Sequence, residues 1–222
     1  MSRGFLFGLV LLVASGALHA GDVKETKSAL ESQPTGWLDL LAAKGLTGWK
    51  RVAIPPGSKL REKSCWRREG DTLVCEGVGV HEMLLYDREI ADGIFHVEWR
   101  FKKLDGKKGY NSGVYVRNSA DGKIWHQAQV GSKNVGYFFG NTLVNGKEQG
   151  FRAANKDVPQ RGKEAGEWNV YEITCNGPRL TLWVNGAVTA EWDKCQVLRG
   201  YFGLEAEGFV IEFKNIKFKD LK

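Results

Sequence analysis

Long hydrophobic runs are absent from this 222-residue sequence, apart from a short one near its start. The apolar segment from Phe5 to Val13 is too short to cross a membrane, and no later segment approaches the length of a spanning helix. Internal repeats and low-complexity stretches are also missing beyond this segment. These absences argue against a membrane-spanning protein and a repeat array, and they favour one globular domain.

Concentrated charge of one sign is lacking as well. The chain has 32 Lys and Arg against 26 Asp and Glu, and the small surplus is scattered apart from pairs at Lys102-Lys103 and Lys107-Lys108. A nucleic-acid-binding protein would need a basic stripe on a recognisable module, and neither is present. We therefore expect no nucleic-acid partner. The surplus is best explained as a solvated surface, with weak attraction to an anionic polysaccharide or membrane surface as the alternative.

Cysteine is scarce, with four residues and no C-x-x-C spacing, so a cysteine-based zinc site is not expected. In an exported chain four cysteines suggest disulfides. Cys65 and Cys75 flank a predicted hairpin turn at 69–71 and form the first predicted pair, which leaves Cys175 and Cys195 as the second. Three connectivities remain open from the sequence.

The N-terminus has the pattern of a secretory signal. Arg3 supplies the positive charge, the apolar run follows, and Ala17 or Ala20 supplies a small residue for cleavage. We predict a signal peptide at 1–20, a polar tether at 21–35 and one domain at 36–222. The expected location is secreted, either periplasmic or extracellular, and no cysteine near the cleavage site suggests a lipid anchor.

Short alternating runs separated by turn dipeptides dominate the rest of the chain. Phe95 to Phe101 and Arg179 to Val184 alternate apolar with polar residues, as half-buried strands do. Asn-Gly and Asp-Gly pairs, which favour hairpin turns, recur between such runs. The pattern predicts an all-β antiparallel sandwich, with a helix only near Leu38–Lys44.

One strand pair carries an unusual set of polar and aromatic residues. Alternation predicts that Arg117, Trp125, Gln127 and Gln129 line one face, with valines and an alanine turned the other way. Guanidinium and amide groups offer donors and acceptors, and an indole ring offers an apolar platform. This combination suits a ligand with many hydroxyl groups, so a carbohydrate is the predicted partner.

Seven short motifs in a fixed order extend this interpretation. The sequence resembles the 3-keto-disaccharide hydrolase family, once a domain of unknown function and also described as 3-keto-glucoside 1,2-lyase/hydratases. The resemblance begins near Gly36 and spans the rest of the chain. The motifs are Leu46-Thr47-Gly48-Trp49, Glu98-Trp99-Arg100, Asn111-Ser112-Gly113 with Arg117, Gly166-Glu167-Trp168-Asn169, Trp183-Val184-Asn185-Gly186, Gly203-Leu204 and Phe213-Lys214-Asn215-Ile216.

The resemblance implies a concanavalin A-like jelly-roll sandwich and an exported enzyme that cleaves the glycosidic bond of 3-keto-glucosides. The outcome would be formal hydrolysis, by elimination and then hydration. Two departures bear on the chemistry. A Glu that many relatives have in the middle strand is the amide Gln127 here, and relatives commonly have a Gln and a His where this chain has Glu205 and Glu207.

The candidate catalytic residues are Arg117, Glu205, Glu207, Glu98 and His126. Arg117 would neutralise an enolate, with a structural bond to a carbonyl or carboxylate as the alternative explanation of this residue. Glu205 with Glu207 could share a proton as an acid–base pair. A solvated edge or a partner for an arginine is an equally weighted explanation of the two glutamates, and a core position is the simpler one for His126. The predicted substrate-binding residues are Asn111, Trp125, Gln127, Gln129, Arg100 and His96, with a cross-sheet ion pair as the simpler explanation of His96, Glu98 and Arg100.

Two other function classes compete with this one. A non-catalytic, lectin-like carbohydrate-binding module would use the same face for binding alone. A glucanase with a Glu-x-Asp-x-x-Glu strand is discounted, because the nearest match at 69–74 lacks the last Glu and falls in a turn. No cofactor is identified, and the oligomeric state stays undetermined. His81, His96 and His126 have no ligand spacing, which argues against a histidine-based metal site, but an oxygen-rich calcium site leaves a divalent metal open.

Overall fold

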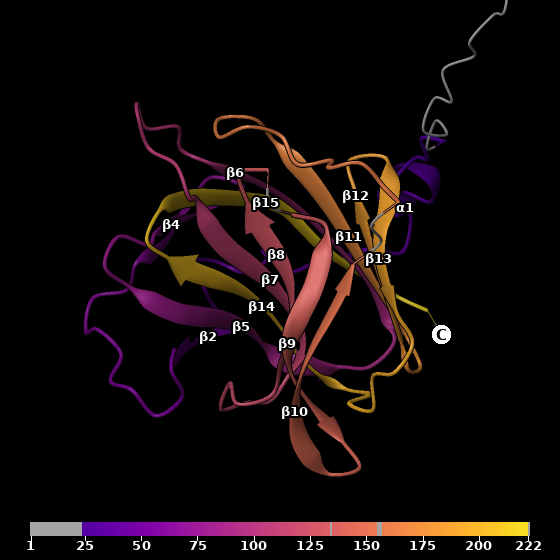
Figure 1. Cartoon of the computed structure of the whole chain (residues 1–222). Coiled ribbons are helices and arrows are strands. Elements are labelled where there is room, and N and C mark those ends of the chain that lie inside the picture. The colour runs from indigo at the N-terminus through magenta and orange to yellow at the C-terminus, as the bar shows by residue number, and fades with distance from the viewer. Residues whose placement is uncertain (1–23, 134, 155–156, 222) are drawn as a thin grey trace, which may run out of the picture.

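The computed structural model describes residues 24–133, 135–154 and 157–221. Two antiparallel sheets pack face to face through these residues (Figure 1). The predicted all-β antiparallel sandwich in a single domain is confirmed. The predicted signal peptide at 1–20 lies outside the described residues, so export stays a prediction. No helix within the described ranges is long and apolar enough to cross a membrane.

The first sheet contains eight strands. In spatial order these are β13 (Ala187–Trp192), β12 (Arg179–Val184), β11 (Asn169–Asn176), β6 (Gly93–Phe101), β15 (Val210–Asp220), β4 (Thr72–Glu76) and β3 (Trp66–Glu69), with β1 (Leu38–Asp39) also pairing with β15. The second sheet contains seven, in the order β10 (Lys147–Ala154), β9 (Tyr137–Val144), β8 (Trp125–Gly131), β7 (Asn111–Asn118), β14 (Gly200–Glu207), β5 (His81–Ile90) and β2 (Trp49–Ala53).

The prediction of a helix near Leu38–Lys44 is wrong. Leu38 and Asp39 form the short strand β1, which pairs with the C-terminal strand β15, and turns follow. Tertiary pairing with a long strand therefore outweighs the local helix preference. The helix α1 is Ala29–Ser32, capped by Ser28 and Glu31 in a reciprocal capping box. This segment of the predicted tether packs on the first sheet, because Glu172 of β11 accepts hydrogen bonds from the α1 backbone.

The core lies between the sheets and follows the predicted alternation. Phe95, Val97, Trp99 and Phe101 of β6 are all buried. The Phe95 ring stacks on Phe202 of the opposite sheet, with centroids 4.7 Å apart. Each large apolar side chain buried in this way contributes about 1.5–3 kcal/mol to folding. The two sheets are thereby held as one rigid support for side chains on their outer faces.

The four cysteines are free in the structure, so neither predicted disulfide is present. Cys65 and Cys75 nevertheless lie side by side, with their sulfur atoms 3.9 Å apart. Cys175 and Cys195 are buried in the core. The hydrogen bond with Cys65, together with burial, raises the pKa of the Cys75 thiol.

Mild oxidation with oxidised glutathione should therefore join Cys65 to Cys75. The Cys65 thiol is the more exposed one, so its thiolate reacts first with the oxidant, and Cys75 then displaces reduced glutathione. Non-reducing peptide mapping before and after oxidation measures the linkage. Cys175 and Cys195 serve as the buried internal control and should stay free. A Cys65 that remains unpaired after oxidation would contradict the prediction.

Candidate functional site

Polar side chains gather on the outer face of the second sheet, over β7, β8, β14 and β5. Alternation along β7 turns Val114 and Val116 into the core and leaves Tyr115 on the outer face. A cavity of about 450 Å³ lies over this face. Its lining is made of Ile54, Pro55, Pro56, His81, Met83, Asn111, Tyr115, Gly122, Trp125, Gln127, Gln129, Phe139, Glu205 and Glu207.

Glu205 is at the centre of this cavity and is only 3% exposed. Three donors converge on its carboxylate. The Tyr115 hydroxyl donates to Oε1 at 2.7 Å, and the Gln127 amide donates to Oε2 at 2.9 Å. His81 Nε2 lies 3.1 Å from Oε1. A buried carboxylate needs such partners, because an unpaired charge is expensive to remove from water.

Glu207 lies two residues further along β14 and faces the same cavity. Its carboxylate accepts a hydrogen bond from the Asn111 amide, whose own oxygen accepts one from Gln129 at 2.6 Å. The Gln129 backbone oxygen is in turn held by the Tyr171 hydroxyl, which reaches across the core from the first sheet at 2.6 Å. Glu207 is therefore oriented by a chain of contacts that begins in the hydrophobic core.

Gly113 explains how Gln127 reaches Glu205. A Cβ at Gly113 would lie 2.2 Å from the Gln127 side-chain nitrogen and 2.6 Å from its Cγ. The Gln127 side chain thus lies flat across the backbone of β7, over a residue without a side chain. The Asn-Ser-Gly motif places a donor to Glu207 at its first position and this space at its third.

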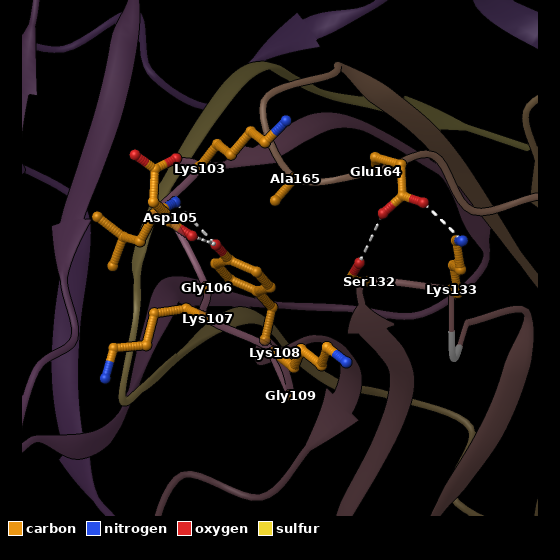
Figure 2. A pocket seen from close by; sticks show the side chains of 12 residues that line it. Lys103, Asp105, Gly106, Lys107, Lys108, Gly109, Ser132, Lys133, Glu164 and Ala165 are labelled. Atoms are coloured by element: carbon orange, nitrogen blue, oxygen red, sulfur yellow. Dashed lines mark hydrogen bonds and ion pairs between the residues drawn. The ribbon is translucent and has the colours of Figure 1, made fainter.

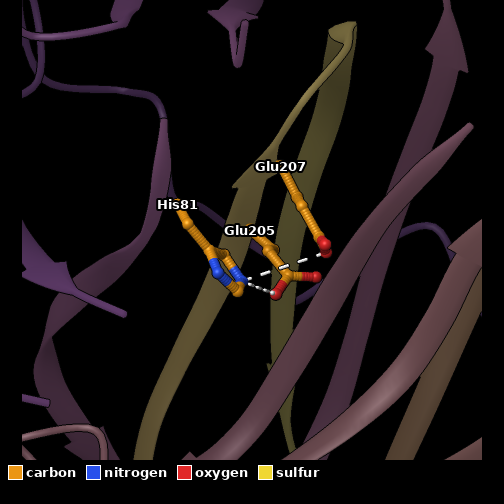
Figure 3. Close-up of side chains that lie close together, drawn as sticks. All are labelled: His81, Glu205 and Glu207. Carbon is orange, nitrogen blue, oxygen red and sulfur yellow. Dashed lines mark hydrogen bonds and ion pairs between the residues drawn. The ribbon is translucent and has the colours of Figure 1, made fainter. Parts of the chain in front are cut away.

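His81 comes from the first position of β5 and pairs in register with Glu207 of β14. Figure 3 shows its imidazole directed at both carboxylates, with Nε2 3.9 Å from Glu207 Oε2. The hydrogen bond with Glu205 raises the pKa of His81 above its ordinary 6.5, with the Glu207 charge adding to the effect. The side chain remains 42% exposed, so it can touch a ligand in the cavity.

Burial raises the pKa of Glu207, and the charge of the neighbouring Glu205 raises it further. Burial also raises the pKa of Tyr115 well above its ordinary range, so this hydroxyl keeps its proton and stays a donor. Besides Tyr115, two groups with raised pKa values, His81 and Glu207, therefore line the cavity. Such shifts are typical of groups that transfer protons.

His81, Glu205 and Glu207 also have the donor types of a metal site. One nitrogen and two carboxylate oxygens lie within 4.8 Å of one another. Imidazole with carboxylates suits divalent cations such as Mn²⁺, Fe²⁺ or Zn²⁺. The three side chains thus fit a divalent cation by chemistry and by spacing.

Aromatic rings form one side of the cavity. Trp125 and Phe139 meet edge to face with centroids 5.2 Å apart, and Tyr115 meets Trp125 in the same way at 6.2 Å. Perpendicular packing of this kind fixes the orientation of each ring. The cavity therefore combines an apolar wall with amide and carboxylate groups.

Six of the predicted site residues lie together around this cavity: Glu205, Glu207, Asn111, Trp125, Gln127 and Gln129. The other five lie elsewhere. The prediction that Arg117 shares a sheet face with Gln127 and Gln129 is wrong. The residue is 2% exposed, and its side chain is turned away from the cavity. It donates to the Gly177 carbonyl at 2.7 Å and pairs with Asp92 at 3.0 Å.

A local irregularity reverses Arg117. Its φ is +52°, and the register between β7 and β14 shifts at this level. A bulge adds a residue to one strand, so alternation counted from Asn111 fails at its end. Arg117 thus lies between the sheets, near the buried thiols of Cys175 and Cys195.

His96, Glu98 and Arg100 lie on β6, in the other sheet. His96 bonds to Glu172 at 2.9 Å, and Arg100 pairs with Glu212. The hydrogen bond with His96 lowers the pKa of Glu98 to about 2, with Asn215 and Lys214 contributing. These contacts match the simpler explanation of a cross-sheet ion-pair network. The three residues do not line the cavity over β7 and β14.

His126 is fully buried between the sheets. Its Nε2 lies 2.8 Å from the Thr142 hydroxyl, and its ring contacts Phe151 and Trp192. Burial lowers the pKa of His126 to about 4. This is the core position that alternation with Ala128 and Val130 indicates.

Sequence reasoning missed His81 and Tyr115. His81 joins the cluster only because β5 pairs with β14, more than a hundred residues later in the chain, and no local spacing reveals that pairing. Tyr115 had a usable signal, since it is in phase with Asn111 and Gly113 and stands opposite Gln127. The pattern of β7 could have identified it.

Comparison with known proteins agrees with this architecture. The sequence matches the family described as 3-keto-alpha-glucoside-1,2-lyase-like domain over residues 36–219. No curated protein matches the chain. A putative glycosyl hydrolase from Parabacteroides distasonis is similar in structure, with a TM-score of 0.58, 19% identity, and coverage of 90% of this chain and 100% of that one.

Two further solved structures share the fold. The carbohydrate-binding module CBM66 from Bacillus subtilis has a TM-score of 0.58 and 15% identity, and the match covers 78% of this chain and 96% of that one. The Bacillus licheniformis β-glucanase has a TM-score of 0.54 and 12% identity, with 86% and 100% covered. At these identities the likeness establishes the jelly-roll sandwich fold.

The position of Arg117 yields a stability prediction. Arg117→Met should lower the free energy of unfolding by about 3 kcal/mol, because it leaves Asp92 and the Gly177 carbonyl without their buried partner. Urea unfolding measures this change, with the exposed Arg88→Met as a matched control that should stay within about 0.5 kcal/mol of the unchanged protein. Unchanged stability together with lost ligand binding or turnover would contradict a structural role.

Proposed function

The chain belongs to the 3-keto-alpha-glucoside-1,2-lyase-like family, and we propose that it cleaves the glycosidic bond of 3-keto-glucosides in the cavity over β7, β8 and β14. One observation carries the proposal. His81, Glu205 and Glu207 converge in a cavity whose lining also offers amides, aromatic rings and other apolar side chains. A sugar needs those walls for binding, and an elimination needs an acid and a base.

The base in this proposal is Glu207. A ketone at C3 of the sugar acidifies the C2 proton, and the Glu207 carboxylate accepts that proton while the electron pair forms an enolate. A raised pKa makes this carboxylate a stronger base than an ordinary glutamate. The hydrogen bond from Asn111 fixes its direction.

The acid is His81 in its protonated form. As the enolate collapses, C1=C2 forms, the C1–O bond breaks, and the leaving oxygen takes the proton of the imidazolium. Water then adds across the double bond, its hydroxyl to C1 and a proton to C2, which gives net hydrolysis. The water proton restores His81, and Glu207 returns the C2 proton.

Glu205 acts as a positioning residue. Its carboxylate is occupied by donors from Tyr115, Gln127 and His81, so it stabilises the protonated imidazole instead of meeting the substrate. The arrangement resembles in logic a carboxylate that orients a catalytic histidine. Glu205 is buried on its side of this interaction, and a charge interaction is stronger where water is excluded.

A divalent cation is the alternative use of the same three groups. His81, Glu205 and Glu207 would hold it. When bound, such an ion would supply a Lewis acid for the carbonyl oxygen and the enolate charge. Asn111 and Gln127 would then orient its carboxylate ligands.

A second candidate function is carbohydrate binding without turnover. The structural likeness to a carbohydrate-binding module favours it, together with the Trp125 and Phe139 rings in the cavity. The presence of an acid–base pair with raised pKa values favours the enzyme. Saturable binding of an unoxidised glycoside without turnover of its 3-keto form would support the binding module.

The purified protein should convert a 3-keto-glucoside to 3-keto-glucose and free aglycone, and leave the unoxidised glucoside intact. Only the ketone makes the C2 proton removable. Glu207→Gln should lower kcat by about 10²–10⁴, the usual contribution of a general base. Product formation followed by NMR or chromatography, with and without a chelator, measures both effects.

The matched control is Glu212→Gln, a carboxylate on the outer face of the other sheet. It should turn over substrate as the unchanged protein does. Activity lost with the chelator and restored by Mn²⁺ would assign the three groups to a metal. No turnover on any keto-sugar would contradict the proposal.

The pH profile of kcat/KM should be bell-shaped. Below the raised pKa of Glu207 the base is protonated, so activity falls as pH decreases. Above the raised pKa of His81 the acid has lost its proton, so activity falls as pH increases. Glu205→Gln should move both limbs to lower pH, because Glu205 raises both pKa values.

Initial rates across about pH 4–10 measure the shift, because this interval spans the ordinary pKa values of glutamate and histidine. Lys123→Gln, which is exposed and outside the cavity lining, provides the control profile. Limbs that stay in place in Glu205→Gln, with only a lower maximum, would contradict the proton-transfer roles.

A further inference from the structure

A second cavity, of about 520 Å³, lies where β6 ends and β7 begins. The loop 102–110 forms one side, and residues of 132–133 and 164–165 form the other (Figure 2). Four lysines and two carboxylates line it: Lys103, Lys107, Lys108 and Lys133 with Asp105 and Glu164. Its lining is therefore positively charged.

Only some of the lysines in this cavity form an ion pair with a carboxylate. Lys133 pairs with Glu164 at 2.6 Å, which accounts for one lysine and one carboxylate. Figure 2 shows Lys103 and Lys108 on opposite sides of the opening, with Lys107 and Asp105 turned outward. Within the described part of the chain no ion pair is formed by Lys103 or Lys108. Two ammonium groups therefore border the opening without a carboxylate in contact, and the charge of Lys103 acts on Glu164 only at longer range.

The loop that carries these lysines is held in place. The Tyr110 hydroxyl accepts a hydrogen bond from the Leu104 backbone at 2.8 Å and contacts the Leu104 carbonyl at 3.3 Å. The Tyr110 ring is buried against Phe101 and Phe209, with centroids 5.2 and 4.7 Å away. The two ammonium groups thus extend from an anchored loop, which lowers the entropy lost when they bind a ligand.

The lysine cavity adjoins the candidate site along the chain. Tyr110 is followed by Asn111, the donor to Glu207, and Ser132 follows Gly131, which pairs with Asn111 in the sheet. Strand alternation turns Tyr110 into the core and Asn111 to the outer face. The two cavities therefore adjoin at the start of β7, where Tyr110 lines the lysine cavity and Asn111 lines the candidate site.

We propose that the lysine cavity is a subsite for the anionic unit of an acidic saccharide, with Lys103 and Lys108 contacting a sugar carboxylate. The inference rests on the proposed function in one respect, that the neighbouring cavity takes a sugar. Charge complementarity gives the rest, because two unpaired ammonium groups around an anchored opening attract a carboxylate. The preferred glycoside then carries a uronosyl residue beside the sugar that is cleaved.

The test compares two ligands by isothermal titration calorimetry: a tetrasaccharide of β-1,4-linked glucuronate and the glucose tetrasaccharide of the same linkage. The acidic ligand should bind more tightly to the unchanged protein. Lys103→Gln/Lys108→Gln should weaken its binding by about twofold to thirtyfold, the range for two exposed ion pairs, and leave the binding of the neutral ligand unaffected. The preference should shrink as salt is added.

Lys102→Gln/Lys147→Gln is the matched control, since it removes the same charge from two exposed lysines outside the cavity lining. Equal binding of the acidic ligand by both double variants would overturn the subsite. Full displacement of the acidic ligand by an equal concentration of inorganic sulfate would also overturn it, as a simple anion site. Failure of the acidic ligand to bind would do the same.

Turnover separates this inference from the proposed function. Lys103→Gln/Lys108→Gln should cleave a neutral 3-keto-glucoside at the unchanged rate, because neither lysine lines the first cavity. Lysine-dependent binding of the acidic ligand without turnover of any keto-sugar would contradict the proposed enzymatic function and still support the subsite.

Discussion

The buried carboxylate of Glu205 is the constraint on which the arrangement of the outer face depends. A charge held at 3% exposure is stable only with donors on most of its oxygen lone pairs. Tyr115, Gln127 and His81 supply these donors from three different strands. Removing any of them would leave part of the charge unsatisfied. The need of Glu205 for donors therefore fixes His81 beside Glu207. The imidazole and the second carboxylate, which both face the cavity, are positioned as a consequence.

The sandwich supports this cluster from behind. Tyr171 crosses the core to hold the Gln129 backbone, and Gln129 orients Asn111. Ser112, whose side chain is buried on the core-facing side of the sheet, donates to the backbone oxygen of Glu205 at 2.8 Å. Hydrogen bonds from a rigid core to a polar face limit the movement of the site, which is how a functional group keeps its direction. The likeness to the carbohydrate-binding module and the β-glucanase extends to the fold alone.

The sequence could predict what is local and periodic. Alternation gave the sandwich, the inward side of β6 and the outward side of Gln127 and Gln129, because side-chain direction in a regular strand depends only on position. It failed at Arg117, where a left-handed residue and a register shift interrupt the strand. It missed His81, whose role depends on which strands pair. Strand order is set by the packing of the whole chain, so no segment of it contains that information.

The need to satisfy the buried Glu205 carboxylate also explains why position 127 is an amide in this chain. The resemblance to 3-keto-disaccharide hydrolases suggests a Glu at this position in relatives and a Gln near the position of Glu205. Here the amide is on β8 and the carboxylate on β14, 2.9 Å apart. A carboxylate at both positions would bring two like charges into hydrogen-bond distance inside a buried site, and one would have to stay protonated. An amide opposite a carboxylate keeps the hydrogen bond and leaves one charge. That charge faces His81, which is why the acid in the proposed mechanism belongs to β5 in this chain.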